Sequence, residues 1–351
     1  MKSKLKMRPC DIARLFGATR TRACAFFAIV LGASPGTAFA CASCGCSINS
    51  DWGVQGLSTT GGWSTDIRYD TLNQNKLRAG TKAISPASAA IATNTQTDAP
   101  AEVEQYTKNN YLTATLDYNN GNSWGVSLVA PYTNRSHSTL GSGSDGDIFD
   151  PANGAYGSSA SGLGDVRLIG RYFGFSDHRN FGVQFGVKLP TGRKNQVSSS
   201  GSPQAVDPGL QLGTGTTDLI AGAYFFDNLA ADWDYFTQAN LQTALRSSDM
   251  AAGSYRPGNS LNLNLGIRYQ GFEALIPTLQ INARYAKPDS GDAADTFATG
   301  GRLVYLTPGV IVPMTEKISA YANVQIPIYQ NVNGIQLTPK YVLSVGARIA
   351  F

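Results

Sequence analysis

The sequence predicts an all-β protein, a transmembrane antiparallel up-and-down β-barrel of about 12 strands that follows a cleaved signal peptide. Three observations predict this fold. Polar and apolar residues alternate over long segments, short and long connections alternate between these segments, and the last segment ends on an aromatic residue. Strands that cross a bilayer need about 9–11 residues and must close into a ring, because lipid offers no hydrogen-bond partner to an open edge.

The first 40 residues have the composition of a secretory signal. Seven basic residues and one acidic residue occupy positions 1–22, an apolar run follows at 23–33, and the A-x-A sequence at 38–40 matches the cleavage pattern of a signal peptidase. The apolar run is shorter than the roughly 20 residues of a spanning helix. We therefore expect residues 1–40 to be a signal peptide and the mature chain to begin at Cys41.

Removal of this leader reverses the sign of the net charge. The chain has 28 basic and 24 acidic residues, and the leader contains 7 and 1 of them, which leaves 21 and 23 and a net charge of −2. The mature protein therefore has no basic surplus for binding nucleic acid. Export also places its thiols in an oxidising compartment, where disulfides form.

Twelve segments have the length and alternation of membrane-crossing strands. In the seventh, Trp233, Tyr235 and Leu241 lie on one face, and Asp234 and Gln238 lie on the other. The alternation continues well beyond the five or six residues of an ordinary strand. The expected strands are residues 61–72, 106–118, 124–134, 164–175, 181–190, 216–226, 231–245, 260–270, 276–286, 300–312, 318–330 and 337–351.

The connections between these strands indicate how the barrel is oriented. Longer segments separate alternate neighbours, except at 331–336. Transmembrane barrels have short turns on the periplasmic side and longer loops outside. We therefore expect both ends of the barrel, 61–351, on the periplasmic side, where residues 41–60 form a Cys-rich segment. Short turns are expected at 119–123, 176–180, 227–230, 271–275 and 313–317.

Aromatic residues collect near the expected strand ends, as in the girdles at membrane interfaces. The last strand carries Tyr341, Leu343, Val345, Ile349 and the terminal Phe351 on one face. This ending resembles that of outer-membrane barrels that carry their assembly signal in the closing strand.

Polar strand faces line the expected lumen, which therefore has mixed charge and a ring of opposite charges at the inner mouth. These ions either pair to fill a narrow polar core or form a selectivity constriction. Twelve strands lie between side-chain-filled barrels and open porins, so we expect a narrow, partly plugged pore. The outer segments 73–105 and 135–163 are long enough to fold inward or to extend as loops. The expected inward charged residues are Asp66, Arg68, Asp70, Asp165, Arg167, Arg171, Lys188, Asp232, Asp234, Arg268, Arg284, Arg302 and Arg348.

Two stretches resemble a known family. "VKLPTG" (187–192) and "DPGLQLGTGTTD" (207–218) are similar to a motif of the outer-membrane barrels assigned to the meta-pathway of phenol degradation. The motif consists largely of turn formers, in which a Pro-Gly pair makes a turn and Gly213 and Gly215 permit positive φ. The resemblance implies a transporter-like barrel for small, hydrophobic or aromatic compounds.

Three cysteines, Cys41, Cys44 and Cys46, form a CxxCxC pattern, and the rest of the mature chain has none. Three soft ligands suit Cu(I), or Zn²⁺ with a fourth ligand from elsewhere. A disulfide between Cys41 and Cys44 leaves Cys46 unpaired, and lipid attachment at Cys41 is a further alternative. This N-terminus also resembles that of a branch of such barrels.

No enzymatic site is expected. The mature chain has two histidines, His137 at the outer rim and His178 in an inner turn, and these cannot share one Ser/His/acid site. No nucleophile elbow, phosphate loop or zinc-helix motif occurs. The predicted function is an outer-membrane channel or transporter for small-molecule solutes, surrounded by outer-membrane lipid. The alternative is a metal-binding or redox-linked module that engages a periplasmic redox or metal-carrying protein through the CxxCxC segment.

Overall fold

The computed structural model describes residues 61–90, 103–139, 156–199 and 205–351. The expected signal peptide, 1–40, and the Cys-rich segment, 41–60, lie outside the described residues, as do the metal, disulfide and lipid predictions for Cys41, Cys44 and Cys46. Within the described ranges, no helix has the length and apolar composition needed to cross a membrane.

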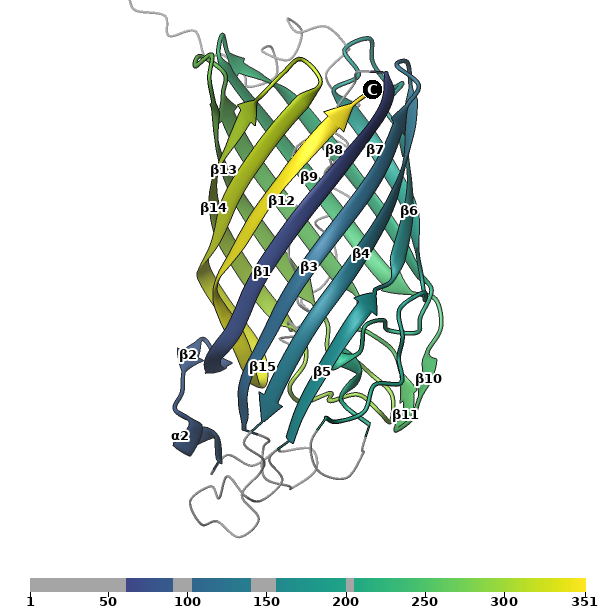
Figure 1. Ribbon diagram of the computed structural model, residues 1–351, viewed down its shortest axis with the longest axis vertical. Helices are drawn as coiled ribbons and strands as arrows, with labels where there is room; N and C mark the ends of the chain where they lie inside the picture. The colour runs from purple at the N-terminus through teal and green to yellow at the C-terminus, as the bar shows by residue number, and fades with distance from the viewer. Residues whose placement is uncertain (1–60, 91–102, 140–155, 200–204) are drawn as a thin grey trace, which may run out of the picture. The chain divides into compact units, whose positions relative to one another are not determined.

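Long strands make up most of the described chain (Figure 1). Ten expected strands each correspond to one observed strand, the last two (318–330 and 337–351) are both part of β15, and four shorter strands are additional. A short α-helix and a 3-10 turn, α2 (Pro86–Ala90) and η1 (Pro208–Leu210), lie in the connections. The strands are β1 (Gly62–Gly80), β2 (Lys82–Ala83), β3 (Glu104–Asn119), β4 (Trp124–Thr139), β5 (Tyr156–Leu163), β6 (Val166–Tyr172), β7 (Phe181–Leu189), β8 (Asp218–Ala230), β9 (Trp233–Ala244), β10 (Ser248–Met250), β11 (Gly253–Tyr255), β12 (Ser260–Tyr269), β13 (Ile276–Ala286), β14 (Gly301–Pro313) and β15 (Ile318–Ala350).

Antiparallel neighbours close the sheet into a barrel. The order is β15, β14, β13, β12, β9, β8, β7, β6, β4, β3 and β1, and β1 pairs with β15 again. A ring of eleven strands cannot be antiparallel throughout, so one of them must reverse direction. Residues 319–332 of β15 pair with β14 and residues 335–350 pair with β1, and Gly334, with φ of 52°, lies in the reversal. Because β15 contributes two of the crossings, eleven labelled strands give the predicted barrel of twelve.

The two faces of the barrel wall have opposite character. Outward residues such as Leu112, Leu116 and Leu128 are exposed, whereas inward residues such as Thr115 and Asn282 are buried. Soluble proteins rarely expose apolar surface on this scale, but a barrel in contact with lipid requires it. The period-two alternation therefore predicted the orientation of the wall correctly.

Aromatic pairs lie where the turns are short, and the chain enters and leaves the barrel at this same opening. Trp63 packs 4.9 Å from Tyr118, and Trp233 packs 4.9 Å from Tyr269, measured between ring centroids. The amide of Phe351 donates to the carbonyl of Trp63 at 2.9 Å, which joins the end of β15 to the start of β1 (Figure 1). We call this the short-turn end and the opposite one the long-loop end.

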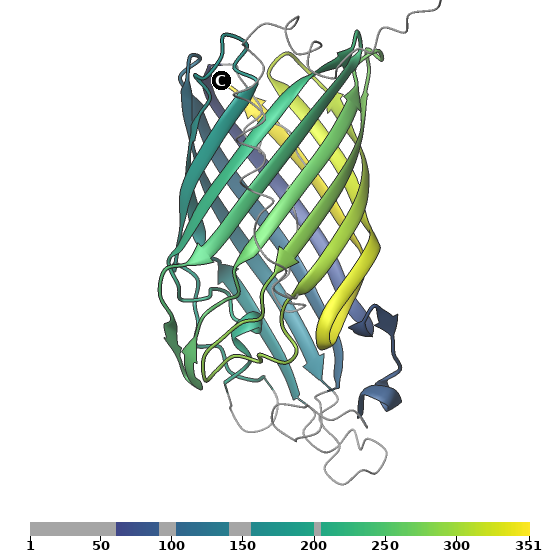
Figure 2. The ribbon, with the colours of Figure 1, turned by 180° about the vertical axis from the view of Figure 1, so that it is seen from behind.

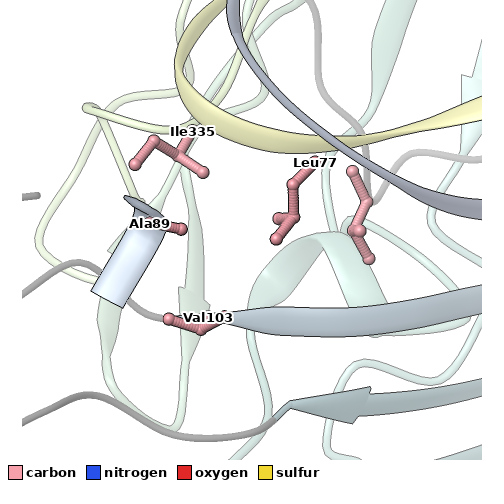
Figure 3. Close-up of a cluster of buried hydrophobic side chains, with 5 residues drawn as sticks. Leu77, Ala89, Val103 and Ile335 are labelled. Atoms are coloured by element: carbon pink, nitrogen blue, oxygen red, sulfur yellow. The ribbon is translucent and has the colours of Figure 1, made fainter. Parts of the chain in front are cut away.

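A small apolar cluster lies at the long-loop end (Figure 3). It packs α2 against the seam between β1 and β15. Of segment 73–105, which we expected either to fold inward or to extend as a loop, the described part continues β1 to Gly80 and then places α2 in this cluster. Its buried members are Leu77, Ala89, Val103, Ile335 and Leu337.

The strand expected at 164–175 is part of a longer one that is interrupted. β5 and β6 both pair with β4, and Gly164 and Asp165 separate them. The amide of Gly164 donates to the carbonyl of Pro131 at 2.8 Å. Because the nitrogen and carbonyl of one strand residue point toward the same neighbouring strand, the nitrogen of Pro131 also faces the interruption, and it carries no hydrogen to donate. The missing ladder bond frees Asp165 from the regular sheet.

Candidate functional site in the barrel lumen

A cavity of about 390 Å³ lies inside the barrel. It extends from side chains in the middle of the wall to the loops after β11 and β13, and basic groups outnumber acidic ones in its lining. The basic lining residues are Arg68, Arg135, Arg167, Arg171, Lys188, Arg284 and Lys287, and the acidic ones are Asp165, Asp218 and Asp289.

Part of the lining comes from the connection between β7 and β8. We call its described residues, 191–199 and 205–217, the lumen loop. Val206, Leu210 and Leu212 of this loop are buried, and η1 lies among them. The sequence suggested the two preceding outer segments, and not this one, as candidates for inward folding.

Two glycines form the neck of the lumen loop. A Cβ on Gly192 would lie 2.7 Å from the Cα of Gly213, so only glycines allow the two backbones to approach this closely. Gly215 has the expected positive φ, 69°, but Gly213 does not, and its role is close packing. The glycines of the motif therefore close the loop on itself.

Arg135, on β4, is the first anchor of the lumen loop. Its guanidinium donates to the carbonyls of Gly209 at 2.5 Å and Gln211 at 3.0 Å. It also donates to the side chain of Asn109 at 2.5 Å and to the hydroxyl of Tyr111 at 3.1 Å. All four acceptors are uncharged, although the guanidinium is buried and permanently ionised.

Lys188, on β7, is the second anchor. Its Nζ lies 3.0 Å from Asp165 Oδ2 and 3.1 Å from Asp218 Oδ2. Asp165 in turn accepts bonds from the amides of Gly192 and Thr214, each at 3.0 Å, one from either side of the neck. One ammonium and two carboxylates therefore join the wall to the lumen loop, and we call Lys188, Asp165 and Asp218 the lysine triad.

Two ion pairs lie in the lumen toward the short-turn end. Arg171 binds both carboxylate oxygens of Asp117, at 2.6 and 3.0 Å. Arg268 Nε lies 2.6 Å from Asp234, and Arg348 donates to a serine hydroxyl of β1 at 3.2 Å. The Arg171 pair has the bidentate geometry that arginine favours.

Further charges on β1 are also bonded within the wall. Arg68 Nε lies 2.9 Å from Asp70, which accepts a bond from the hydroxyl of Ser344 at 2.6 Å. The hydroxyl of Tyr321 donates to Asp66 at 2.9 Å. We call this part of the lumen the charged wall, which consists of Asp66, Arg68, Asp70, Asp117, Arg135, Asp165, Arg167, Arg171 and Lys188, carried by β1, β3, β4, β6 and β7 and by the break before β6.

Uncharged amides line the strands across the lumen. Asn264 donates to Gln238 at 3.2 Å, Asn282 donates to Asn264 at 2.9 Å, and the hydroxyl of Thr307 donates to Asn282 at 2.6 Å. The chain of bonds crosses β9, β12, β13 and β14, which are drawn in green to yellow-green in Figure 2. We call Gln238, Asn240, Asn264, Gln280 and Asn282 the amide wall.

Two residues expected in the lumen lie elsewhere. Asp232 is exposed in the turn before β9, because β9 begins at Trp233, two residues after the start of the expected strand. Arg302 is exposed on the outer face of β14, 6.0 Å from the ring of Tyr285, since its neighbour Leu303 is the buried one. The other expected residues lie on the inner face: Asp66, Arg68, Asp70, Asp165, Arg167, Arg171, Lys188, Asp234, Arg268, Arg284 and Arg348.

Several lumen residues were not anticipated. Asp117 and Asp218 lie on the polar faces of expected strands, so counting every acid on those faces would have found them. Arg135 was missed because the expected strand ended one residue before it, whereas β4 continues to Thr139. Phe236 is buried in the lumen beside Tyr224, although an aromatic residue on a polar face signals nothing by itself.

The two histidines lie at opposite ends of the barrel. His137 is buried on the inner face of β4, where its Nδ1 lies 2.9 Å from the hydroxyl of Thr107, rather than in a loop at the rim. His178 is exposed in a short turn. No group of three or more His, Cys, Asp or Glu side chains in the described ranges could hold a metal ion.

Asp289 lies at the long-loop end, after β13. Burial raises the pKa of its carboxyl group. Two donors act against burial, the amide of Gly258 at 2.7 Å and the hydroxyl of Tyr255 at 2.9 Å. Asp289 therefore joins two outer loops through a carboxylate whose ionised form is costly to bury.

A closed antiparallel barrel with an apolar outer face and a polar interior defines the class of outer-membrane β-barrels. The structure is similar to that of an outer membrane channel from Pseudomonas putida F1, with a TM-score of 0.59 at 14% identity over 83% of this chain and 96% of that one. At this identity the similarity shows the fold.

Weaker similarities include other barrels. The CymD monoaromatic hydrocarbon channel has a TM-score of 0.44 at 10% identity, covering 88% of this chain and 94% of that one. The toluene transporter TodX of P. putida has a TM-score of 0.43 at 11% identity, covering 83% and 90%. No protein-family model and no curated protein matches the sequence.

Proposed function

We propose that this protein is a channel of the outer membrane that passes small molecules. The observation that carries the proposal is a cavity of about 390 Å³ enclosed by a barrel with an apolar exterior. Pockets for small ligands begin at about 300 Å³. The free space therefore suits one small organic molecule at a time.

Liposome swelling and planar-bilayer conductance test this proposal. We expect the wild-type protein to accelerate swelling with solutes of one sugar or aromatic ring, and to give no acceleration with a large oligosaccharide. Heat-unfolded protein in the same liposomes is the control. The absence of both signals, with no swelling for any solute and no conductance in the bilayer, would contradict the channel function.

The resemblance of residues 187–192 and 207–218 to a motif of the phenol-degradation barrels supports hydrophobic or aromatic cargo. The residues that line the cavity narrow the class of expected solutes, because guanidinium groups bind aromatic faces and carboxylates whereas amides bind polar groups. We therefore favour aromatic solutes that carry a polar or anionic group. Swelling should be faster with sodium benzoate than with benzylamine hydrochloride, and the opposite order would contradict this preference.

The CxxCxC segment supports a second candidate function, a metal- or redox-linked module that engages a periplasmic partner. The observation is three thiols within six positions of the expected mature N-terminus. Titration of a peptide of residues 41–60 with Cu(I) and Zn²⁺ tests this alternative, with Cys44→Ser as the control. Binding that is equal in both peptides, or absent, would exclude a thiol-dependent site.

A further inference from the structure

We infer that the lumen loop is the size-selecting constriction of the channel, held by Arg135 at its tip and by the lysine triad at its neck. The inference rests on the proposed channel function. It assigns a role to the glycine-rich stretch around 207–218, which the sequence presents only as a series of turns.

The first step is that the loop is a folded unit. The side chain of Gln211 accepts a bond from the amide of Gln196 at 2.7 Å and donates to the carbonyl of Val206 at 3.0 Å. The amide of Gly213 donates to the carbonyl of Arg193 at 3.0 Å, which closes the neck. Compact loops with closed necks keep their shape when they pack against a wall.

The second step is that this unit occupies the passage. Its residues Pro208, Gly209 and Leu212 line the same cavity as Asn264 of the amide wall and Arg171 of the charged wall. The loop therefore reduces the width left by a ring of twelve strands. Any solute that crosses the barrel at this level passes between the lumen loop and the amide wall.

The third step is that the two anchors hold different parts of the loop. Arg135 binds two carbonyls at the tip, on either side of Leu210. Asp165 binds an amide on each strand of the neck, and Lys188 holds Asp165 in place. Removing one anchor leaves the other attached, so release of the loop requires the loss of both.

The experiment compares Arg135→Ala, Asp165→Asn and the double variant with Arg284→Ala. Arg284 is a matched control because it lines the same cavity and donates to Asn262 of β12 at 3.0 Å. Arg284→Ala removes the same side-chain atoms and the same charge from the lumen as Arg135→Ala does. Each variant is studied as the full chain, and heat-dependent gel mobility identifies the folded barrel.

Two readouts separate the constriction from the channel. The first is single-channel conductance, which we expect to rise about twofold or more in the double variant and by a smaller factor in Arg284→Ala, because a wider lumen carries more ions. The second is labelling of Leu210→Cys by an impermeant maleimide, scored at position 210 by peptide mass spectrometry. Release of this buried site should raise the labelling rate about tenfold or more.

The outcomes are distinct. Faster labelling and higher conductance in the double variant alone support the inference. Equal labelling in the double variant and in Arg284→Ala overturns it, whatever the conductance. If faster labelling occurs in a barrel that never conducts, the anchored loop stands and the channel function fails.

A loop-replacement variant tests the same inference if the double variant does not fold. Replacement of residues 206–212 by a short Gly-Ser linker removes the tip of the loop and leaves Arg135 and the lysine triad in the wall. We expect the same rise in conductance and swelling with larger solutes. An unchanged size limit would overturn the constriction.

Discussion

The charged wall and the amide wall bury polar groups by different means. In the charged wall, Arg171 and Lys188 are each held by carboxylates, at distances between 2.6 and 3.1 Å. In the amide wall, Asn282 and its neighbours bond to one another in an uncharged chain. A buried charge costs far more than a buried amide when its partner is lost.

This difference suggests a division of roles. The lumen loop contacts the charged wall through both of its anchors, where strong and directional bonds are available. Gln238, Asn240 and Asn264 of the amide wall line the remaining cavity and offer donors and acceptors without net charge. We therefore expect substitutions in the charged wall to change stability, loop position and ion selectivity, and those in the amide wall to have smaller effects.

The largest effect is expected for Lys188→Met. This substitution leaves Asp165 and Asp218 buried without their cation, which costs about 3–5 kcal/mol of the free energy of unfolding. Urea unfolding in detergent micelles measures it. The triple variant with Asp165→Asn and Asp218→Asn should recover most of the loss, and a cost of the single variant equal to that of the triple would show that the carboxylates are not the cause.

A smaller loss is expected for Asn282→Leu in the amide wall. Asn264 and Thr307 each lose a partner in the interior, which costs about 1–3 kcal/mol. The same unfolding measurement applies, with the outward Ala283→Leu on the same strand as a neutral control. A loss as large as that of Lys188→Met would remove the contrast between the two walls.

Ion selectivity should respond to Arg167→Gln. Arg167 lines the cavity, so the loss of its charge should lower the chloride-to-potassium permeability ratio by about a factor of two. Reversal potentials in a KCl gradient measure this ratio. Asn240→Gln in the amide wall is the matched control and should leave the potential unchanged, whereas an equal shift in both variants would contradict a selectivity role of the charged wall.

The smallest effect is the pH dependence caused by Asp289. Because burial raises the pKa of this carboxyl group in the folded protein, its contribution to stability is fully present below the ordinary Asp pKa and is lost as the pH rises through the raised value. Asp289→Asn should flatten this part of the pH profile. Protease resistance of the loops after β11 and β13, measured from acid to neutral pH, tests the sign, and resistance that rises with pH in the wild type would reverse it.

Much of the fold could be predicted from local pattern. The period-two alternation predicted the strands and their outward faces. The alternation of connection lengths predicted that the first and last strands have their free chain ends at the short-turn end. Boundaries were less certain, because β1 and β4 continue beyond the expected strands and alternation alone does not say where pairing stops. Arg135 was lost from the expected site for this reason.

Tertiary structure decided which charges meet and where the lumen loop lies. Arg135, Asp165, Lys188 and Asp218 are far apart in the sequence, and only closure of the barrel brings them around one cavity. The sequence by itself determined the barrel, because alternation and turns are local properties that the membrane selects strand by strand. The partners inside the lumen depend on strand register and on a loop that crosses it, and these are non-local.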